Sequence, residues 1–263
     1  MISPLTELRV GSAEFDQPPC PVKTKLIICS TPRSGSYLLC RAMIHNGIGI
    51  PHEYFNGINA GILSSRYGLG TIDSRHLEAG DAARRAYVAA LLERRTINGI
   101  FAAKIQRGQF RQYFKSTESL ELFQDAQVIY LYREDLLAQA ISLHLSLLTG
   151  RWGVDDTVTT RPVADPQFFD NDLIAKQLEE LATQDKEWRL FFANNAIRPL
   201  FLSYEGIKND LAGALRKIVT SFGLHLPSQD FNYVERPPID IRGPSEPSKS
   251  EIKDRFLQAV REK

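Results

Sequence analysis

One segment near the start of the chain constrains the fold more than any other: a short apolar run that ends in a small polar loop. The run occupies residues 25–29 (KLIIC), and residues 30–36 (STPRSGS) follow it. From Ser36 the apolar residues recur at helical spacing until Asn46 and Gly47 stop them. This order predicts a buried strand, a loop and a helix.

The alternation of strand and helix patterns continues along the rest of the chain. Further strands are predicted at residues 99–105, 127–132 and 199–203, and helices at 82–95, 134–148, 170–195, 206–222 and from 250 onward. Alternating strands and helices imply an α/β fold, in which a mainly parallel central sheet is covered by helices on both faces.

The ends of the predicted domain are rich in proline. Residues 1–24 contain four prolines and little periodicity, so we expect an N-terminal extension that lies on the surface. Residues 25–263 then form a single domain. Residues 236–247 hold four more prolines and a glycine, which predicts a long ordered loop or lid.

Composition excludes several classes of function. Lysine and arginine (32) nearly balance aspartate and glutamate (31), so we expect no nucleic-acid partner, and any anion site must be local. No apolar run is long enough for a membrane span and the N-terminus lacks a signal-peptide pattern, which predicts a cytoplasmic protein without integral membrane contact. The three cysteines lack metal-ligand spacing, so we expect reduced thiols and no metal site.

The loop at residues 30–36 is a candidate anion site. It lies at the carboxyl end of a predicted parallel strand, where a helix begins and directs free N–H groups toward a ligand. Ser34 and Ser36 offer hydroxyl donors, Arg33 offers a planar fork, and Gly35 lets the backbone approach the ligand. The alternative is a surface turn whose serines only cap the helix.

The loop differs from the nucleotide-triphosphate P-loop in two ways. No lysine follows Gly35, and no glycine opens the loop. A transferring group that carries less charge than a phosphoryl group therefore fits better, which favours sulfuryl transfer. A P-loop-type small-molecule kinase and a catalytically silent nucleotide-binding regulator stay open as alternatives.

Two segments resemble the donor site of sulfotransferases that use 3′-phosphoadenosine 5′-phosphosulfate (PAPS). Residues 33–39 (RSGSYLL) resemble the 5′-phosphosulfate loop, and residues 128–142 resemble the 3′-phosphate element, in which an arginine at a strand end and a serine on the next helix hold the phosphate. The resemblance implies donor contacts from Pro32, Arg33, Ser34, Gly35, Ser36, Tyr37, Arg133, Gln139 and Ser142. Arg236 and Arg242 either close over the nucleotide or are solvated loop residues.

Further motifs resemble the bacterial trehalose-sulfotransferase family from about Lys25 to the C-terminal helix. Residues 51–55 (PHEYF) resemble its Pro-Gln-Glu-aromatic-aromatic segment, residues 99–104 (GIFAAK) a strand that ends in lysine, and residues 149–152 (TGRW) an acceptor-side segment. This resemblance implies a P-loop-NTPase-like sulfotransferase fold, PAPS as donor without a metal, and a possible homodimer. Ala102-Ala103 and Arg107 depart from the family pattern, which leaves the acceptor open among sugars, glycolipids and related small molecules.

The resemblance also assigns catalytic roles. Glu53 is the expected general base for the acceptor hydroxyl, with its neighbour His52 as the alternative, since an unperturbed histidine titrates near neutrality. Arg33 and Lys104 are expected to stabilise charge on the transferring group, although Lys104 is alternatively a solvated strand terminus. The residues expected to contact the acceptor are His52, Glu53, Tyr54, Phe55 and Trp152.

Overall fold

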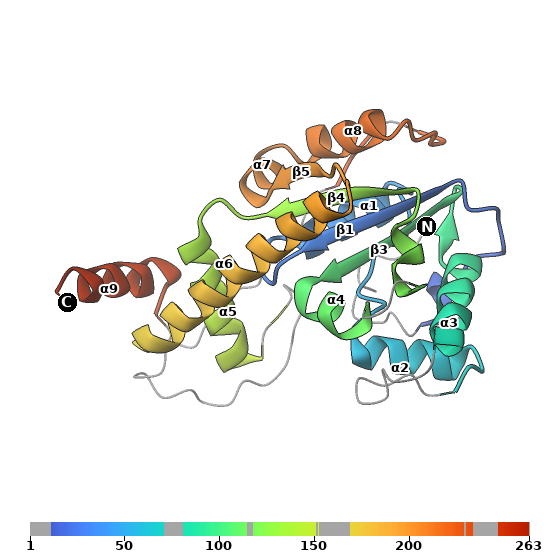
Figure 1. The fold of residues 1–263 in the computed structure, drawn as a ribbon. Coiled ribbons are helices and arrows are strands. Elements are labelled where there is room, and N and C mark those ends of the chain that lie inside the picture. Colours follow the sequence, from blue (N-terminus) through green and yellow to red (C-terminus); the bar gives the residue numbers. More distant parts are fainter. Residues whose placement is uncertain are drawn as a thin grey trace.

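The computed structural model describes residues 12–70, 81–114, 118–150, 152, 169–228, 230–233 and 247–262. Figure 1 shows their arrangement around one central sheet. Within these residues the strand order is β2-β3-β1-β4-β5. The strands are β1 (Thr24–Ser30), β2 (Thr96–Ile97), β3 (Ile100–Gln106), β4 (Ala126–Tyr132) and β5 (Leu200–Ser203).

The sheet is mainly parallel, as the alternating pattern predicts. Strand β1 pairs in parallel with both β3 and β4, and β4 pairs in parallel with β5. The short strand β2 is antiparallel to β3 and lies at the edge. Because β1 is central, the loop that follows it lies between the carboxyl ends of two neighbouring strands.

Helices cover both faces of the sheet. One face packs against α2 (Gly57–Arg66), α3 (Asp81–Arg94), α4 (Arg107–Tyr113) and α6 (Asn171–Asn194). The other packs against α1 (Ser36–His45), α7 (Tyr204–Asn209) and α8 (Leu211–Ser221). Successive strand residues alternate between these two cores, because neighbouring side chains of a strand point to opposite faces.

Two helices extend beyond the sheet. In Figure 1, α9 (Lys249–Arg261) lies beside α5 (Leu136–Thr149). Ile252 and Phe256 of α9 pack in a separate cluster with Ile141 of α5 and Ile174 of α6. This apolar contact fixes the last helix next to the segment that follows β4.

The stretch at residues 206–222, predicted as one helix, forms two. Asp210 lies between them with a non-helical φ of −143°, and its side chain accepts a hydrogen bond from the N–H of Gly213. An aspartate bonded in this way begins a new helix, so α7 ends before it and α8 starts after it. Helices α2 and α4 were not predicted, since α2 contains two glycines and α4 is only seven residues long.

Part of the N-terminal extension, residues 12–17, contacts the domain, whereas residues 18–23 are mostly exposed. The side chain of Phe15 is buried, and the Asp16 carboxylate lies 3.0 Å from Arg95 Nη2 and accepts a 3.0 Å hydrogen bond from the Tyr67 hydroxyl. Arg66 also pairs with Asp16. Since Arg95 is fully buried, Asp16 supplies the counter-charge that its burial requires. Two short 3-10 turns, Ala13–Phe15 and Glu118–Phe123, complete the described elements.

None of the helices in the described parts of the chain combines the length and apolar character that crossing a membrane requires.

Candidate functional site

The loop between β1 and α1 has the geometry of an anion site. Arg33 and Gly35 both adopt left-handed backbone conformations, with φ of 65° and 80°. Gly35 is the N-cap of α1, where no side chain caps the first turn. The interpretation of the serines as helix caps is therefore wrong. The N–H groups of the first helical turn have no intrahelical partner, so they are available to an anion.

The hydroxyl of Ser34, in this loop, lacks a hydrogen-bond partner among the described residues. The Ser34 side chain is fully buried. Ser30 Oγ, at the end of β1, is in the same state. A buried hydroxyl without a partner carries a desolvation penalty of about 1–3 kcal/mol, which a bound oxyanion would remove.

Gly35 packs against an aromatic ring of the protein. A Cβ atom added there would lie 2.3 Å from Cδ2 of Tyr204, the first residue of α7. Glycine is thus required by the positive φ and by the aromatic ring that packs on it. That Gly35 also lets the backbone approach a ligand stays a prediction.

Helix α5 holds the loop from the other side. The Gln139 amide nitrogen donates to Thr31 Oγ1 at 2.8 Å and to the Pro32 carbonyl at 2.6 Å. Ser142 Oγ accepts a 3.1 Å hydrogen bond from Arg33 Nε. Gln139 and Ser142 therefore share a helix face directed at the loop, as their spacing predicts. The side-chain amide of Gln139 positions the loop, and both of its N–H donors are used in hydrogen bonds to Thr31 and Pro32.

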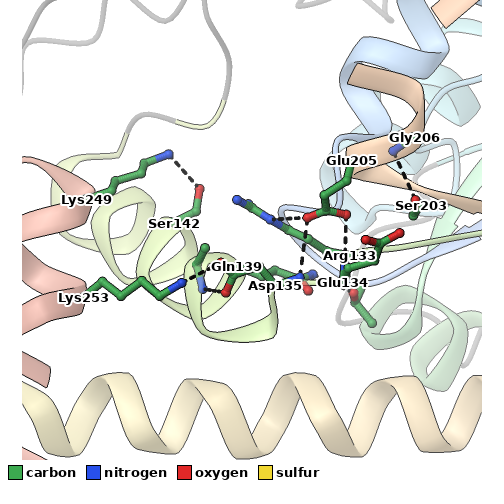
Figure 2. Close-up of polar contacts among 12 residues, drawn as sticks. Arg133, Glu134, Asp135, Gln139, Ser142, Ser203, Glu205, Gly206, Lys249 and Lys253 are labelled. Atoms are coloured by element: carbon green, nitrogen blue, oxygen red, sulfur yellow. Dashed lines mark hydrogen bonds and ion pairs between the residues drawn. The ribbon is translucent and has the colours of Figure 1, made fainter. Parts of the chain in front are cut away.

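Arg133 lies just beyond β4, as predicted for a strand-end arginine. Its Nε is 3.6 Å from Glu205 Oε1, and its guanidinium lies 4.7 Å from the centre of the Tyr204 ring (Figure 2). Nε is buried and makes no hydrogen bond within the described chain. Glu205 also accepts a 3.0 Å hydrogen bond from the N–H of Glu134. The carboxylate of Glu205 holds Arg133 in place while part of the guanidinium's donor capacity remains unused.

Glu53 and Lys104 form a buried ion pair. Lys104 Nζ is 2.8 Å from Glu53 Oε1, and the two residues are only 2% and 8% exposed. Gln106 Nε2 donates to the same oxygen at 2.9 Å, and Gln109 Nε2 donates to Oε2 at 2.6 Å. Lys104 is therefore not a solvated strand terminus.

The charge states of this pair follow from the same contacts. Burial opposes ionisation of Glu53, but the Lys104 ammonium and the hydrogen bond from Gln109 outweigh it and hold the pKa of Glu53 below its usual value. Burial likewise opposes the charge of Lys104, yet the Glu53 carboxylate raises the pKa of Lys104 above its usual value. Both groups are ionised at neutral pH.

Tyr37 connects the ion pair to the anion loop. Its ring centre lies 3.8 Å from Lys104 Nζ, close enough for a cation–π contact. Tyr37 is the second residue of α1. In the β1–β3 register Gln106 lies opposite Ser30, and Lys104 is two residues before Gln106 on the same strand. The carboxylate and the loop thus meet at one edge of the sheet.

The remaining acceptor-side predictions fall in different environments. His52 Nδ1 accepts a 2.6 Å hydrogen bond from the N–H of Glu53, so in the neutral ring Nε2 carries the proton. Tyr54 and Phe55 are buried in the core, where Phe55 packs on Tyr113 with ring centres 4.6 Å apart. Their predicted contact with an acceptor does not fit this placement. Trp152 is 42% exposed, and its carbonyl accepts a hydrogen bond from Arg33.

Sequence reasoning missed Gln106 and Gln109. Glutamine side chains carry no motif, and only their contact with Glu53 marks them. Gln106 N also donates to Gln109 Oε1 at 3.1 Å in a reciprocal cap of α4, so the two amides support each other. The predicted residues Arg236 and Arg242 lie outside the described residues. In the parts of the chain that are described, no three metal-ligating side chains cluster.

Comparison with protein families decides the classification. The model of the Stf0 sulphotransferase family matches residues 25–256, which includes the anion loop, the ion pair and most of α9. The chain belongs to this family. The resemblance to the trehalose-sulfotransferase-like family is thereby confirmed, and the α/β fold of this Stf0 sulphotransferase agrees with it. A search of curated proteins found no match to the chain.

Proposed function

We propose that this Stf0 sulphotransferase takes a sulfuryl group from PAPS and transfers it to a hydroxyl of a carbohydrate, glycolipid or related small acceptor. Glu53 is the general base of the proposed reaction. One observation carries the proposal: an ionised, buried carboxylate lies beside the anion loop, linked to it through Lys104 and Tyr37. A buried, ionised carboxylate beside an anion loop favours a catalytic role over a nucleotide-binding module without chemistry.

The donor-side residues fit a molecule with two anionic ends. Ser34 Oγ and the uncapped N-terminus of α1 suit the 5′-phosphosulfate, beside the guanidinium of Arg33. Arg133, whose guanidinium is held by Glu205, and Ser142 suit the 3′-phosphate. When bound, PAPS would supply the sulfuryl group and the adenosine bisphosphate that leaves as an anion.

The hydrogen bonds of Glu53 indicate which oxygen accepts the proton. Lys104 and Gln106 occupy both lone pairs of Oε1, whereas within the described residues Gln109 occupies only one on Oε2. Oε2 can therefore accept the proton of an acceptor hydroxyl. His52 is the weaker candidate, because the Nδ1 lone pair is already engaged.

In this proposal Lys104 stabilises the charge of the base, and Arg33 stabilises the charge of the transferring group. Lys104 is paired with Glu53, so it keeps the base ionised and fixes its orientation. Arg33 bonds to Ser142 through Nε and to the Trp152 carbonyl through Nη1, which fixes the position of its guanidinium. Charge that develops on the transferring oxygens would then be stabilised by Arg33 and the first turn of α1.

Calorimetric titration tests the donor directly. Wild type, Arg33→Ala and Arg133→Ala are titrated with 3′,5′-adenosine bisphosphate and, separately, with ATP plus magnesium. We expect the wild type to bind the bisphosphate and both variants to lose affinity. Binding of ATP with magnesium but not of the bisphosphate would replace this proposal with the kinase alternative.

Acceptor identity requires a turnover assay with PAPS. Trehalose, other sugars and glycolipids are offered to the wild type and to Glu53→Gln, with sulfated product measured by mass spectrometry. We expect product from the wild type alone. Bisphosphate binding without product from any acceptor would support the silent regulator instead.

A further inference from the structure

The first turn of α9 carries a lysine that reaches α5. Lys249 Nζ lies 3.3 Å from Ser142 Oγ, as Figure 2 shows. Ser142 is buried, and its Oγ also accepts the hydrogen bond from Arg33 Nε. Both lone pairs of this hydroxyl are therefore occupied by cationic donors, so its proton can only be donated to a further group. A bound anion would be a suitable acceptor.

Three cations from three separate elements gather here. Arg33 comes from the loop after β1, Arg133 from the end of β4 and Lys249 from α9. Within the described residues, Lys249 forms no ion pair with a carboxylate. Lys249 is exposed as a residue, but burial of its ammonium end, together with the charges of Arg33 and Arg133, lowers the pKa of Lys249 to about 8. Like charges brought together at this cost are typical of a site that binds a multiply charged anion.

We propose that Lys249 binds the 3′-phosphate of the donor together with Ser142 and Arg133. This inference rests on the proposed function, because it takes PAPS as the donor. The contact with Ser142 places the ammonium at the residue that suits the 3′-phosphate. Lys249 thus contributes to the proposed donor site from α9, more than 100 residues after Ser142 in the chain. No sequence motif indicated this residue.

Lys253 provides a matched control on the same helix. It lies one turn after Lys249, and its Nζ is 2.7 Å from Asp135 Oδ2 (Figure 2). That ion pair is partly exposed and attaches α9 to the start of α5 without contacting Ser142. Loss of Lys253 removes the same charge from the same helix but leaves the proposed phosphate contacts intact.

The test uses two nucleotides that differ by one phosphate. Wild type, Lys249→Met and Lys253→Met are titrated calorimetrically with 3′,5′-adenosine bisphosphate and with adenosine 5′-phosphate, and thermal unfolding confirms that all three are folded. We expect Lys249→Met to weaken bisphosphate binding about 10- to 100-fold, the effect of one lost charge-assisted hydrogen bond. Binding of the 5′-phosphate by Lys249→Met, and of both nucleotides by Lys253→Met, should change little.

Three other results of these titrations would each contradict a different part of the proposal. Unchanged bisphosphate binding by Lys249→Met, with normal wild-type binding, removes Lys249 from the site and leaves the proposed function intact. Equal weakening of both nucleotides would contradict the assignment to the 3′-phosphate. Failure of the wild type to bind the bisphosphate would overturn the proposed donor and, with it, the role of Lys249.

The pH dependence of binding offers a second readout. The pKa of Lys249 is lowered to about 8, so Lys249 loses its proton within the pH range of the titration. Wild-type affinity for the bisphosphate should therefore fall as pH rises from about 7.5 to about 9.5. Lys249→Arg should bind with little change over that range. Identical pH profiles for the two proteins would contradict the proposed contact.

Discussion

The two sides of the site differ in how completely the protein satisfies their polar groups. On the donor side, Ser34 Oγ and Arg133 Nε are buried without hydrogen-bond partners in the described structure. On the acceptor side, the Glu53 carboxylate is bound by Lys104, Gln106 and Gln109. On the proposed donor side these two atoms lack hydrogen bonds, although Arg133 is paired with Glu205, whereas the carboxylate of the proposed base is bound by three donors. Such preorganisation lowers the cost of reorganisation during the reaction.

The largest effect is expected from Glu53→Gln. The amide cannot accept the hydroxyl proton, so kcat should fall about 10²- to 10⁴-fold. Binding of 3′,5′-adenosine bisphosphate should stay near the wild-type value, because Glu53 belongs to the other side of the site. Steady-state turnover and calorimetry on the same preparations check both statements. A variant that turns over normally would contradict the assignment of the base.

Lys104→Met should chiefly affect stability. It leaves the Glu53 carboxylate buried without its cation, which costs about 3–5 kcal/mol in free energy of unfolding. Urea denaturation measures this loss. The double variant with Glu53→Gln should recover part of it, since no unpaired charge then remains. Simple addition of the two losses would show that the pair is not coupled.

Gly35→Ala probes the donor side. The left-handed φ and the contact with Tyr204 should together cost about 1–3 kcal/mol of stability. Addition of Tyr204→Ala should relieve the contact but not the backbone strain, so recovery should be partial in thermal unfolding. A Gly35→Ala variant as stable as the wild type would contradict the steric explanation.

Gln109→Leu should have the smallest effect, seen in the pH profile. Removal of the hydrogen bond to Oε2 raises the pKa of Glu53, since that bond stabilises the charged form. A base acts when deprotonated, so the acidic limb of the kcat profile should move to higher pH. Gln106→Leu is the matched control, because it removes a hydrogen-bond donor from Oε1 and leaves Oε2, the oxygen proposed to accept the hydroxyl proton, unchanged. A limb that stays in place in both variants would contradict the role of these amides.

Strands and long helices were predictable, because their apolar periodicity records which face is buried. The run at residues 25–29 and the helix at 170–195 are confirmed within about two residues, the usual uncertainty of element ends. The break at Asp210 was missed, because the apolar periodicity continues across it and only the side-chain cap divides the helix. Helix α2 was missed because its glycines and serines are poor helix formers that tertiary packing stabilises.

The candidate site was predictable only where a motif is local. Residues 30–36 and Glu53 stand in short recognisable segments, and the structure places both at the carboxyl edge of the sheet. Tyr54 and Phe55 belong to the same segment as Glu53, yet they lie in the core. Adjacent residues of an irregular segment point in different directions, and the sequence does not state which direction faces the site.

By itself, the sequence determined the class of fold, the place of the anion loop and the identity of the candidate base. These features depend on local periodicity and on short motifs. The tertiary structure alone decided that Lys104 is paired with Glu53, that Gln109 contacts the same carboxylate and that Lys249 reaches Ser142. Those contacts join residues far apart in the chain, and only the packing of strands and helices around the sheet brings their side chains within hydrogen-bond distance.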